Sequence, residues 1–184
     1  MKEYVILVDQ DDKETGKMEK LQAHVEAKLH RAFSVFIFNS KGELLLQQRA
    51  FSKYHTPGLW TNTCCSHPRP GEATADAAHR RMVEEMGFDC GFEEVFSFHY
   101  KAKFSNELTE HEIDHVFIGF SDTKPVINRQ EVEDYHYTSM DILAKEIKDK
   151  PENFTIWFRI AFDRVREYLE NHPLNPKQNS TLKT

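Results

Sequence analysis

A charged segment that ends in glycine, GEATADAAHRRMVEEMG at residues 71–87, constrains the fold of this chain more than any other feature. It is rich in alanine, glutamate, arginine and methionine, which favour helix, and a Pro-Gly turn at Pro70 and Gly71 introduces it. Glycine commonly follows the last turn of a helix because it adopts left-handed backbone angles without strain, so Gly87 marks the expected end. We therefore predict a helix over residues 71–87.

Short apolar segments on both sides of this helix predict strands. The expected strands are residues 4–8, 32–38, 43–49, 93–104, 112–120 and 132–139. The turn at 39–42 makes a hairpin of 32–38 and 43–49. Two more helices are expected, at 139–150 with Ser139 as N-cap and at 153–170, whereas residues 18–30 show a mixed pattern. This order predicts an α+β layered fold around a mixed sheet.

The length of 184 residues suits one domain, which we place at residues 1–172. The polar remainder, residues 173–184, is expected to be a frayed tail. A net charge of −6 argues against general binding to nucleic acid, and no segment approaches the ~20 apolar residues of a membrane helix. The first ten residues, MKEYVILVDQ, predict no signal peptide, and the odd number of cysteines suits a reducing compartment. We expect a cytoplasmic monomer or weak dimer with no nucleic-acid or membrane partner.

The predicted helix carries residues in the order of a Nudix box, which it resembles. The matches are Glu72, Arg80, Met82, Glu84, Glu85, Gly87 and Phe88. The pattern fails at Ser66, where glycine is expected, and at Arg81, where glutamate is expected. Glutamates along one helix gather divalent metal, which neutralises a diphosphate. Arg81 lies one turn before Glu85 and can pair with it, so a cation replaces a metal-binding carboxylate and hydrolysis is put in doubt.

Histidines and acids elsewhere in the chain suggest a separate metal site. Glu110 and Glu112 alternate near the start of an expected strand, so their carboxylates point the same way. His24 and His30 are six residues apart, so they share a face if the chain between them is extended but not if it is helical. His67 follows two residues after the second of the adjacent cysteines. Three imidazoles and two carboxylates make a five-ligand site for Mg²⁺, Mn²⁺ or Zn²⁺. Taken singly, each is more often an ordinary polar residue.

The stretch TNTCCSHP at residues 61–68, with LHRAFSVFIFN upstream, the altered Nudix box and Glu-His-Glu at 110–112, resembles type 1 isopentenyl-diphosphate isomerases. The resemblance runs from about Val5 to Phe162 and implies a Nudix-type α/β/α sandwich around the mixed sheet. It also implies a metal-dependent, flavin-independent isomerase of isoprenoid biosynthesis. In this family isopentenyl diphosphate and dimethylallyl diphosphate interconvert through a tertiary carbocation, with a proton gained at C4 and another lost from C2.

The same resemblance implies a role for each matching residue. Cys65 exchanges the C2 proton, and Glu112 with Tyr100 beside it serves C4, whereas Cys64 points away and packs as a small apolar residue. A thiolate at Cys65 requires a pKa depressed by nearby cations. Trp157 offers an indole face to the carbocation. The implied metal ligands are His24, His30, His67, Glu110 and Glu112, with Glu85 for a diphosphate-linked Mg²⁺. The implied diphosphate contacts are Lys20, Arg49, Lys53 and Arg81, with Arg69 as an addition.

Two other functions fit parts of the sequence. A Nudix diphosphate hydrolase explains the box, but not Arg81, Cys65 or the histidines and glutamates outside it. A zinc-binding interaction module could use His24, His30, His67 and a cysteine as closed structural ligands. Nothing in the sequence resembles a glycine-rich flavin site.

Overall fold

The computed structural model describes residues 2–53, 55–103 and 108–173. Its strands are β1 (Tyr4–Val8), β2 (Glu14–Glu19), β3 (His30–Phe38), β4 (Leu44–Arg49), β5 (Trp60–Thr61), β6 (Cys64–Ser66), β7 (Phe92–Lys103), β8 (Thr109–Phe120) and β9 (Val132–Thr138). Its helices are α1 (Lys20–Val25), α2 (Thr74–Met86), α3 (Met140–Asp149), η1 (Pro151–Asn153) and α4 (Ile156–Asn171). The predicted tail lies outside the described residues except for Pro173.

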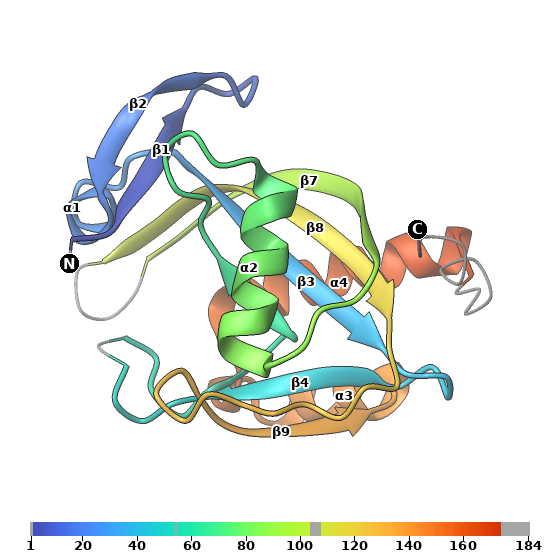
Figure 1. The fold of residues 1–184 in the computed structure, drawn as a ribbon. Helices are drawn as coiled ribbons and strands as arrows, with labels where there is room; N and C mark the ends of the chain where they lie inside the picture. The colour runs from blue at the N-terminus through green and yellow to red at the C-terminus, as the bar shows by residue number, and fades with distance from the viewer. Residues whose placement is uncertain (1, 54, 104–107, 174–184) are drawn as a thin grey trace.

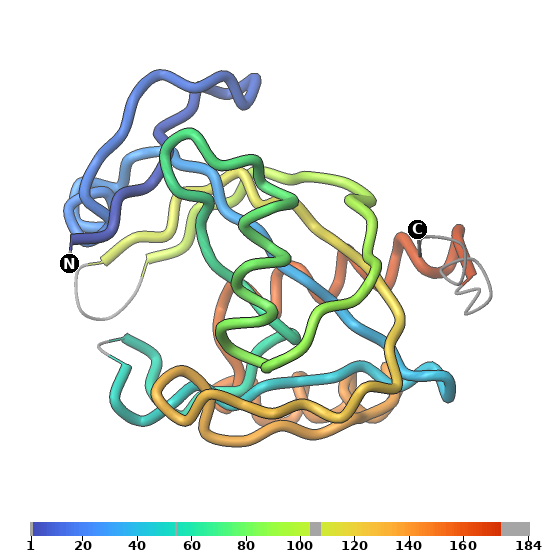
Figure 2. The backbone as a smooth tube through the Cα atoms, in the orientation of Figure 1, coloured from blue at the N-terminus to red at the C-terminus, as the bar shows by residue number. Residues whose placement is uncertain are grey.

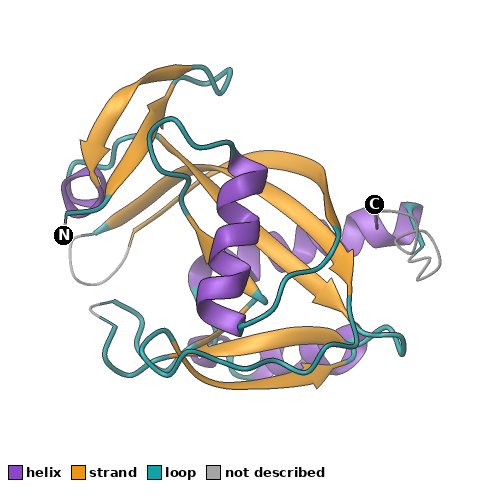
Figure 3. Ribbon diagram, in the orientation of Figure 1, coloured by secondary structure: helices purple, strands orange, loops and turns teal. Residues whose placement is uncertain are grey.

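The strands form a mixed sheet with helices on both faces, so the expected α+β sandwich is confirmed (Figures 1 and 3). Strand β3 is the centre: it pairs antiparallel with β6 and β1 and runs parallel to β8. Helix α2 covers one face and α4 lies on the other (Figure 1). Ser139 caps α3 as predicted, because its side chain accepts a hydrogen bond from the Ile142 amide.

The predicted hairpin of β3 and β4 is wrong beyond its turn. The two strands pair only at Phe38 and Leu44, and then they diverge. From there β3 pairs with β8 along its length, whereas β4 pairs with β9 and β5. Both strands are rich in buried residues, and each finds a longer partner elsewhere in the sheet.

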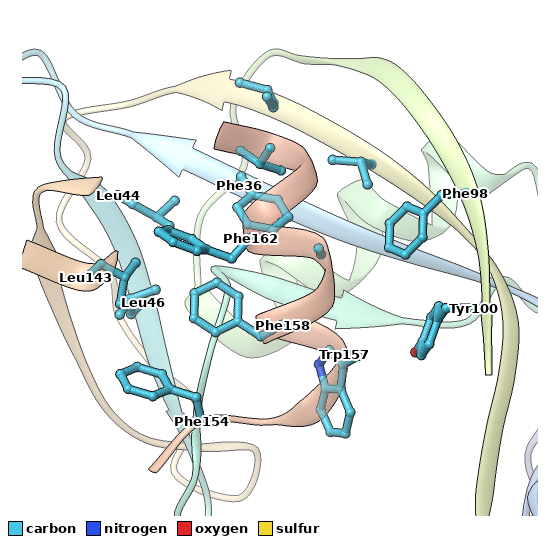
Figure 4. Packing of buried hydrophobic residues seen from close by; sticks show 14 of the residues in the cluster. Phe36, Leu44, Leu46, Phe98, Tyr100, Leu143, Phe154, Trp157, Phe158 and Phe162 are labelled. Carbon is cyan, nitrogen blue, oxygen red and sulfur yellow. The ribbon is translucent and has the colours of Figure 1, made fainter. Parts of the chain in front are cut away.

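The alternation of side chains along β3 separates two apolar cores. Phe33, Val35 and Ile37 pack with residues of α2, whereas Phe36 and Phe38 pack with residues of α4. Figure 4 shows the second of these cores, with Tyr100 and Trp157 at one end of it. Both of these side chains also line a cavity at the edge of this core.

The segment 18–30, which shows no clear pattern in the sequence, contains three elements. It holds the end of β2, all of α1 and the first residue of β3, with Ala27 at a positive φ of 51° in the connection. The glutamate before α1, Glu19, accepts hydrogen bonds from the first amides of the helix. Helix α1 packs against β8, so the chain folds back toward the sheet at this end (Figure 2).

The glycine that ends α2 generates a stability prediction. Gly87 has a φ of 73°, its amide donates to the Val83 carbonyl, and a Cβ atom there would collide with the Val126 backbone. Gly42 has a similar φ of 75° and open space around it. We expect Gly42→Ala to cost about 1 kcal/mol from left-handed strain alone. We expect Gly87→Ala to cost a further ~1–3 kcal/mol from the collision. Urea unfolding measures both, and equal losses would contradict this account of the helix end.

Candidate active site

A cavity of about 390 Å³ beside Trp157 gathers most of the residues predicted from the sequence. All three predicted catalytic residues line it, as do all the predicted diphosphate contacts except Arg69. The predicted residues on its wall are Lys20, Arg49, Lys53, Cys65, His67, Arg81, Glu85, Tyr100, Glu110, Glu112 and Trp157. Arg69 lies in an adjoining hollow instead. Segments from across the chain therefore meet at one place.

The pairing around β3 explains how these side chains come together. Cys65 on β6 lies opposite Ser34, and Glu112 on β8 lies opposite His30. Tyr100 on β7 lies opposite Glu112. Paired residues on adjacent strands project to the same face, so these side chains share the face that looks away from α2. Cys64 projects to the other face, where it is completely buried in the core under α2, as predicted.

Three histidines and two glutamates form a buried cluster at one side of the cavity. One ligand atom from each of them lies within 4.8 Å of all the others, and the five residues are His24, His30, His67, Glu110 and Glu112. The His24 Nε2 atom lies 3.1 Å from Glu110, and the His67 Nε2 atom lies 2.9 Å from Glu112. The predicted convergence of the five is therefore present in the structure.

Backbone carbonyls orient two of these imidazoles. His24 Nδ1 lies 2.6 Å from the Lys20 carbonyl oxygen, and His30 Nδ1 lies 2.8 Å from the Lys28 carbonyl oxygen. A carbonyl only accepts hydrogen bonds, so each Nδ1 carries the proton and each Nε2 presents a lone pair to the cluster. This is the arrangement by which proteins hold histidine ligands to metals. The cluster therefore suits a divalent cation, which would offset the charge of the buried carboxylates.

The two clustered glutamates differ in their electrostatics. Burial and the charge of Glu112 raise the pKa of Glu110 well above its usual range. Burial opposes ionisation of Glu112 as well, but the adjacent imidazoles, with His67 at hydrogen-bond distance, outweigh it and hold the pKa of Glu112 well below its usual range. Tyr100 donates to Glu112 Oε2 at 2.6 Å, and burial raises the pKa of its phenol, so it remains a donor. Glu112 is thus the ionised acceptor of this group.

The structure does not give Cys65 the depressed pKa that a thiolate at this position requires. Burial raises the pKa of this thiol to about 12, and the positive charge of Arg49 offsets only part of that effect. The sequence places cations in the region but does not say how deeply the sulfur is buried, and burial is the larger influence. Arg49 also lies over the Trp157 ring, with 5.2 Å from its guanidinium carbon to the ring centroid.

The cationic side of the cavity contains a carboxylate that sequence reasoning missed. Glu131 pairs with both Lys53 and Arg81, and it lies in the polar connection before β9, where no motif marks it. Arg81 also pairs with Glu84 and with Glu85, the second as predicted. Gln47 donates to the other oxygen of Glu85 at 2.7 Å. Two predicted diphosphate cations thus share one anionic partner.

Two further residues on the cavity wall were not predicted. Asp114, two positions after Glu112, is buried and accepts a 2.8 Å hydrogen bond from Ser34. The two-residue alternation of a strand could have predicted Asp114, because this residue continues the series of Glu110 and Glu112 on one face. The His55 ring lies 5.9 Å from the Trp157 ring between centroids, in an irregular loop that gave no signal.

Comparisons with known proteins show the family of this chain. The family model for the NUDIX domain matches residues 28–158. An isopentenyl-diphosphate Delta-isomerase of Pectobacterium atrosepticum is 52% identical over 164 residues, which cover 89% of this chain and 92% of that protein. The isopentenyl-diphosphate Delta-isomerase 2 of Aromatoleum aromaticum is 48% identical over 165 residues, covering 90% of this chain and 87% of that protein.

Solved structures with low sequence identity share the fold. A crystal structure of a Deinococcus radiodurans protein superposes with a TM-score of 0.74 at 20% identity, covering 88% of this chain and 98% of that one. The crystal structure of the MutT protein of Methanosarcina mazei superposes with a TM-score of 0.63 at 20% identity, covering 76% of this chain and 94% of that one. Among the described residues, no helix has the length and apolar character needed to cross a bilayer.

The histidine–glutamate cluster predicts selective loss of metal on mutation. We expect His67→Ala to lower the affinity for a divalent ion by ~10–100-fold, because it removes one of the five clustered ligands, the one in contact with Glu112. His99→Ala is the matched control, since His99 is exposed on β7 outside the cluster. Elemental analysis after dialysis and a competitive chelator titration give the metal content and affinity. Equal affinities in the two variants would contradict the site.

Proposed function

The chain belongs to the isopentenyl-diphosphate Delta-isomerases of the NUDIX domain family, and we propose that Cys65 and Glu112 perform its two proton transfers. The protein is an isomerase that interconverts isopentenyl diphosphate and dimethylallyl diphosphate. One observation carries the assignment of residues: Cys65 and the hydrogen-bonded pair of Tyr100 and Glu112 line one cavity. The hydrocarbon can lie between them, with one group at C2 and the other at C4.

The diphosphate of the substrate binds at the cationic side of the cavity in this proposal. Lys20, Arg49, Lys53 and Arg81 supply positive charge there, and planar guanidinium groups match phosphate oxygens in pairs. Glu131 pairs with Lys53 and Arg81, so the substrate competes with this carboxylate for the two cations. Glu85 would hold a Mg²⁺ ion that enters with the diphosphate, and Gln47 and Arg81 fix its position.

Glu112 and Tyr100 supply the proton that C4 gains in the forward reaction. Tyr100 donates to Glu112 Oε2, so the two groups can pass one proton between them. The cluster of His24, His30, His67, Glu110 and Glu112 would hold Mg²⁺, Mn²⁺ or Zn²⁺, which supplies positive charge that makes nearby groups more acidic. Glu112 belongs both to that cluster and to the cavity wall. The pair of Glu112 and Tyr100 can therefore be made more acidic by the cation and still reach the alkene carbon of the substrate.

Cys65 exchanges the proton at C2, and Trp157 stabilises the carbocation intermediate. The tertiary cation needs negative charge without a nucleophile, which the face of an indole provides. Thr61 accepts a 3.0 Å hydrogen bond from Trp157 Nε1 and so fixes the ring. Cys65 removes the C2 proton in the forward direction and returns it in the reverse direction. Arg49 is the cation that favours the thiolate required for the forward step.

The two alternative functions fit the structure less well. Arg81 occupies a position where the Nudix box has a glutamate, and its guanidinium has no lone pair for a metal, so it pairs with three carboxylates instead. A closed zinc site of histidines and a cysteine is not formed among the described residues, because the converging group has two glutamates and no cysteine. Release of inorganic pyrophosphate or phosphate from isopentenyl diphosphate at a rate comparable to isomerisation would favour the hydrolase.

We further propose one isomerase domain at residues 1–172, acting in the cytoplasm as a monomer or weak dimer. The continuous sheet from β1 to β9 supports the single domain. The three cysteines are unpaired in the structure, which fits a reducing compartment.

The two adjacent cysteines supply a matched pair of variants. We expect Cys65→Ala to remain folded and to lose ~10²–10⁴-fold in kcat, because it loses an acid–base group. We expect Cys64→Ala to keep kcat within a few-fold and to lose about 1 kcal/mol of stability, because it only removes a buried sulfur. An isomerisation assay by NMR with Mg²⁺ and no flavin measures both, beside circular dichroism for folding. Equal activities in the two variants would rule out the role of Cys65.

A further inference from the structure

A second hollow, of about 650 Å³, adjoins the catalytic cavity and has a marked excess of positive charge. The β1–β2 hairpin, residues 66–70 and α2 enclose it. Its walls contain one acidic residue, Glu3, and six basic ones: Lys2, Lys17, Lys20, Arg69, Arg80 and Arg81. The whole chain carries a net charge of −6, so this excess is local and runs against the balance of the protein.

Three of the six cations already have close carboxylate partners. Arg80 pairs with Glu72 and Glu84, and Lys20 pairs with Glu3. Arg81 pairs with the carboxylates of the catalytic cavity. These side chains are therefore largely neutralised where they stand.

The other three cations are not neutralised in this way. No ion pair of Lys2 or Lys17 is found within the described part of the chain, and Lys17 instead lies 5.9 Å from the centre of the Tyr4 ring. Arg69 forms a long ion pair with Glu84, at 3.9 Å, and 65% of its side chain is exposed. Two cations without an ion pair among the described residues, and a third with a long and exposed one, concentrate a positive potential around this concave surface.

We propose that this hollow is a second anion site that binds a small molecule carrying two or more phosphate groups. Its volume lies in the range of small-molecule sites, and its concave shape fits a compact ligand better than an extended macromolecule. Arg69 presents a planar fork of donors, and Lys2 and Lys17 present mobile ammonium groups, a combination that matches phosphate oxygens. Tyr4 and Pro70 add an apolar wall for the rest of the ligand.

The position of this site connects it to catalysis. The hollow and the catalytic cavity share Lys20, Ser66, His67 and Arg81 on their walls. An anion in the hollow contacts Lys20 and Arg81, which also line the substrate cavity, so each ligand weakens the binding of the other without excluding it, and the anion inhibits the reaction. This consequence rests on the proposed function, whereas binding itself does not depend on it.

Calorimetric titration with inorganic pyrophosphate tests the site directly. The titration uses purified protein near physiological salt, without added divalent metal, so that the probe stays uncomplexed. We expect two binding events in the wild type, one in each hollow. The double variant Lys17→Glu with Arg69→Glu should weaken binding in the second hollow by at least ~10-fold, because two cations that attract the pyrophosphate are replaced by carboxylates that repel it. Arg49→Ala with Lys53→Ala should weaken the other binding event.

A matched control separates a site from a general effect of charge. Lys13→Glu with Lys145→Glu makes the same change in net charge at exposed positions outside the hollow. Equal weakening by the control, or a single event in the wild type that Lys17→Glu with Arg69→Glu leaves unchanged, overturns the proposal. If the isomerase assay fails while both events persist, the proposed function fails and the second anion site stands.

Discussion

The pairing of β3 with β6 on one side and with β8 on the other brings the residues of the catalytic cavity together. It sets Cys65 opposite Ser34 and Glu112 opposite His30, so side chains from three strands share one face of the sheet. Strand β7 then adds Tyr100 opposite Glu112. Because side chains alternate along a strand, a register slip of one residue in β6 would turn Cys65 into the core under α2 and bring Cys64 to the cavity. The difference in role between the two cysteines is therefore a consequence of register.

The same face concentrates buried charge, which shapes the rest of the site. Glu110, Glu112 and Asp114 follow one another along β8, and all three are less than 6% exposed. Burying carboxylates is costly unless cations or hydrogen bonds compensate them. The first two lie among histidines from α1, β3 and the segment after β6, in a cluster where a divalent cation would offset their charge, and Ser34 donates to the third. The structure thereby collects metal ligands, an acid–base group and diphosphate cations around one space large enough for a five-carbon substrate.

Sequence reasoning predicted the parts of this arrangement that depend on local pattern. The helix ending at Gly87, the cap at Ser139 and the opposite directions of Cys64 and Cys65 follow from helix, turn and strand periodicity. The strand partners of β3 and β4 could not be predicted, because they depend on contacts between distant segments. The same is true of Glu131, whose role exists only when the connection before β9 folds over Lys53 and Arg81. The raised pKa of Cys65 likewise depends on burial, which no motif reports. The metal ligands were found through family resemblance rather than spacing, since α1 and its turn separate His24 from His30.

The central claim is that Glu112 and Cys65 act on different carbons of one substrate, and deuterium exchange in heavy water tests it most directly. NMR follows the C2 and C4 positions of isopentenyl diphosphate during incubation with Cys65→Ala and with Glu112→Gln. We expect Cys65→Ala to exchange hydrogen at C4 while forming little dimethylallyl diphosphate, because protonation and its reversal need only Glu112 and Tyr100. We expect neither exchange nor product with Glu112→Gln. Exchange at C4 by Glu112→Gln, or rapid product formation by Cys65→Ala, would contradict the assignment of the two groups.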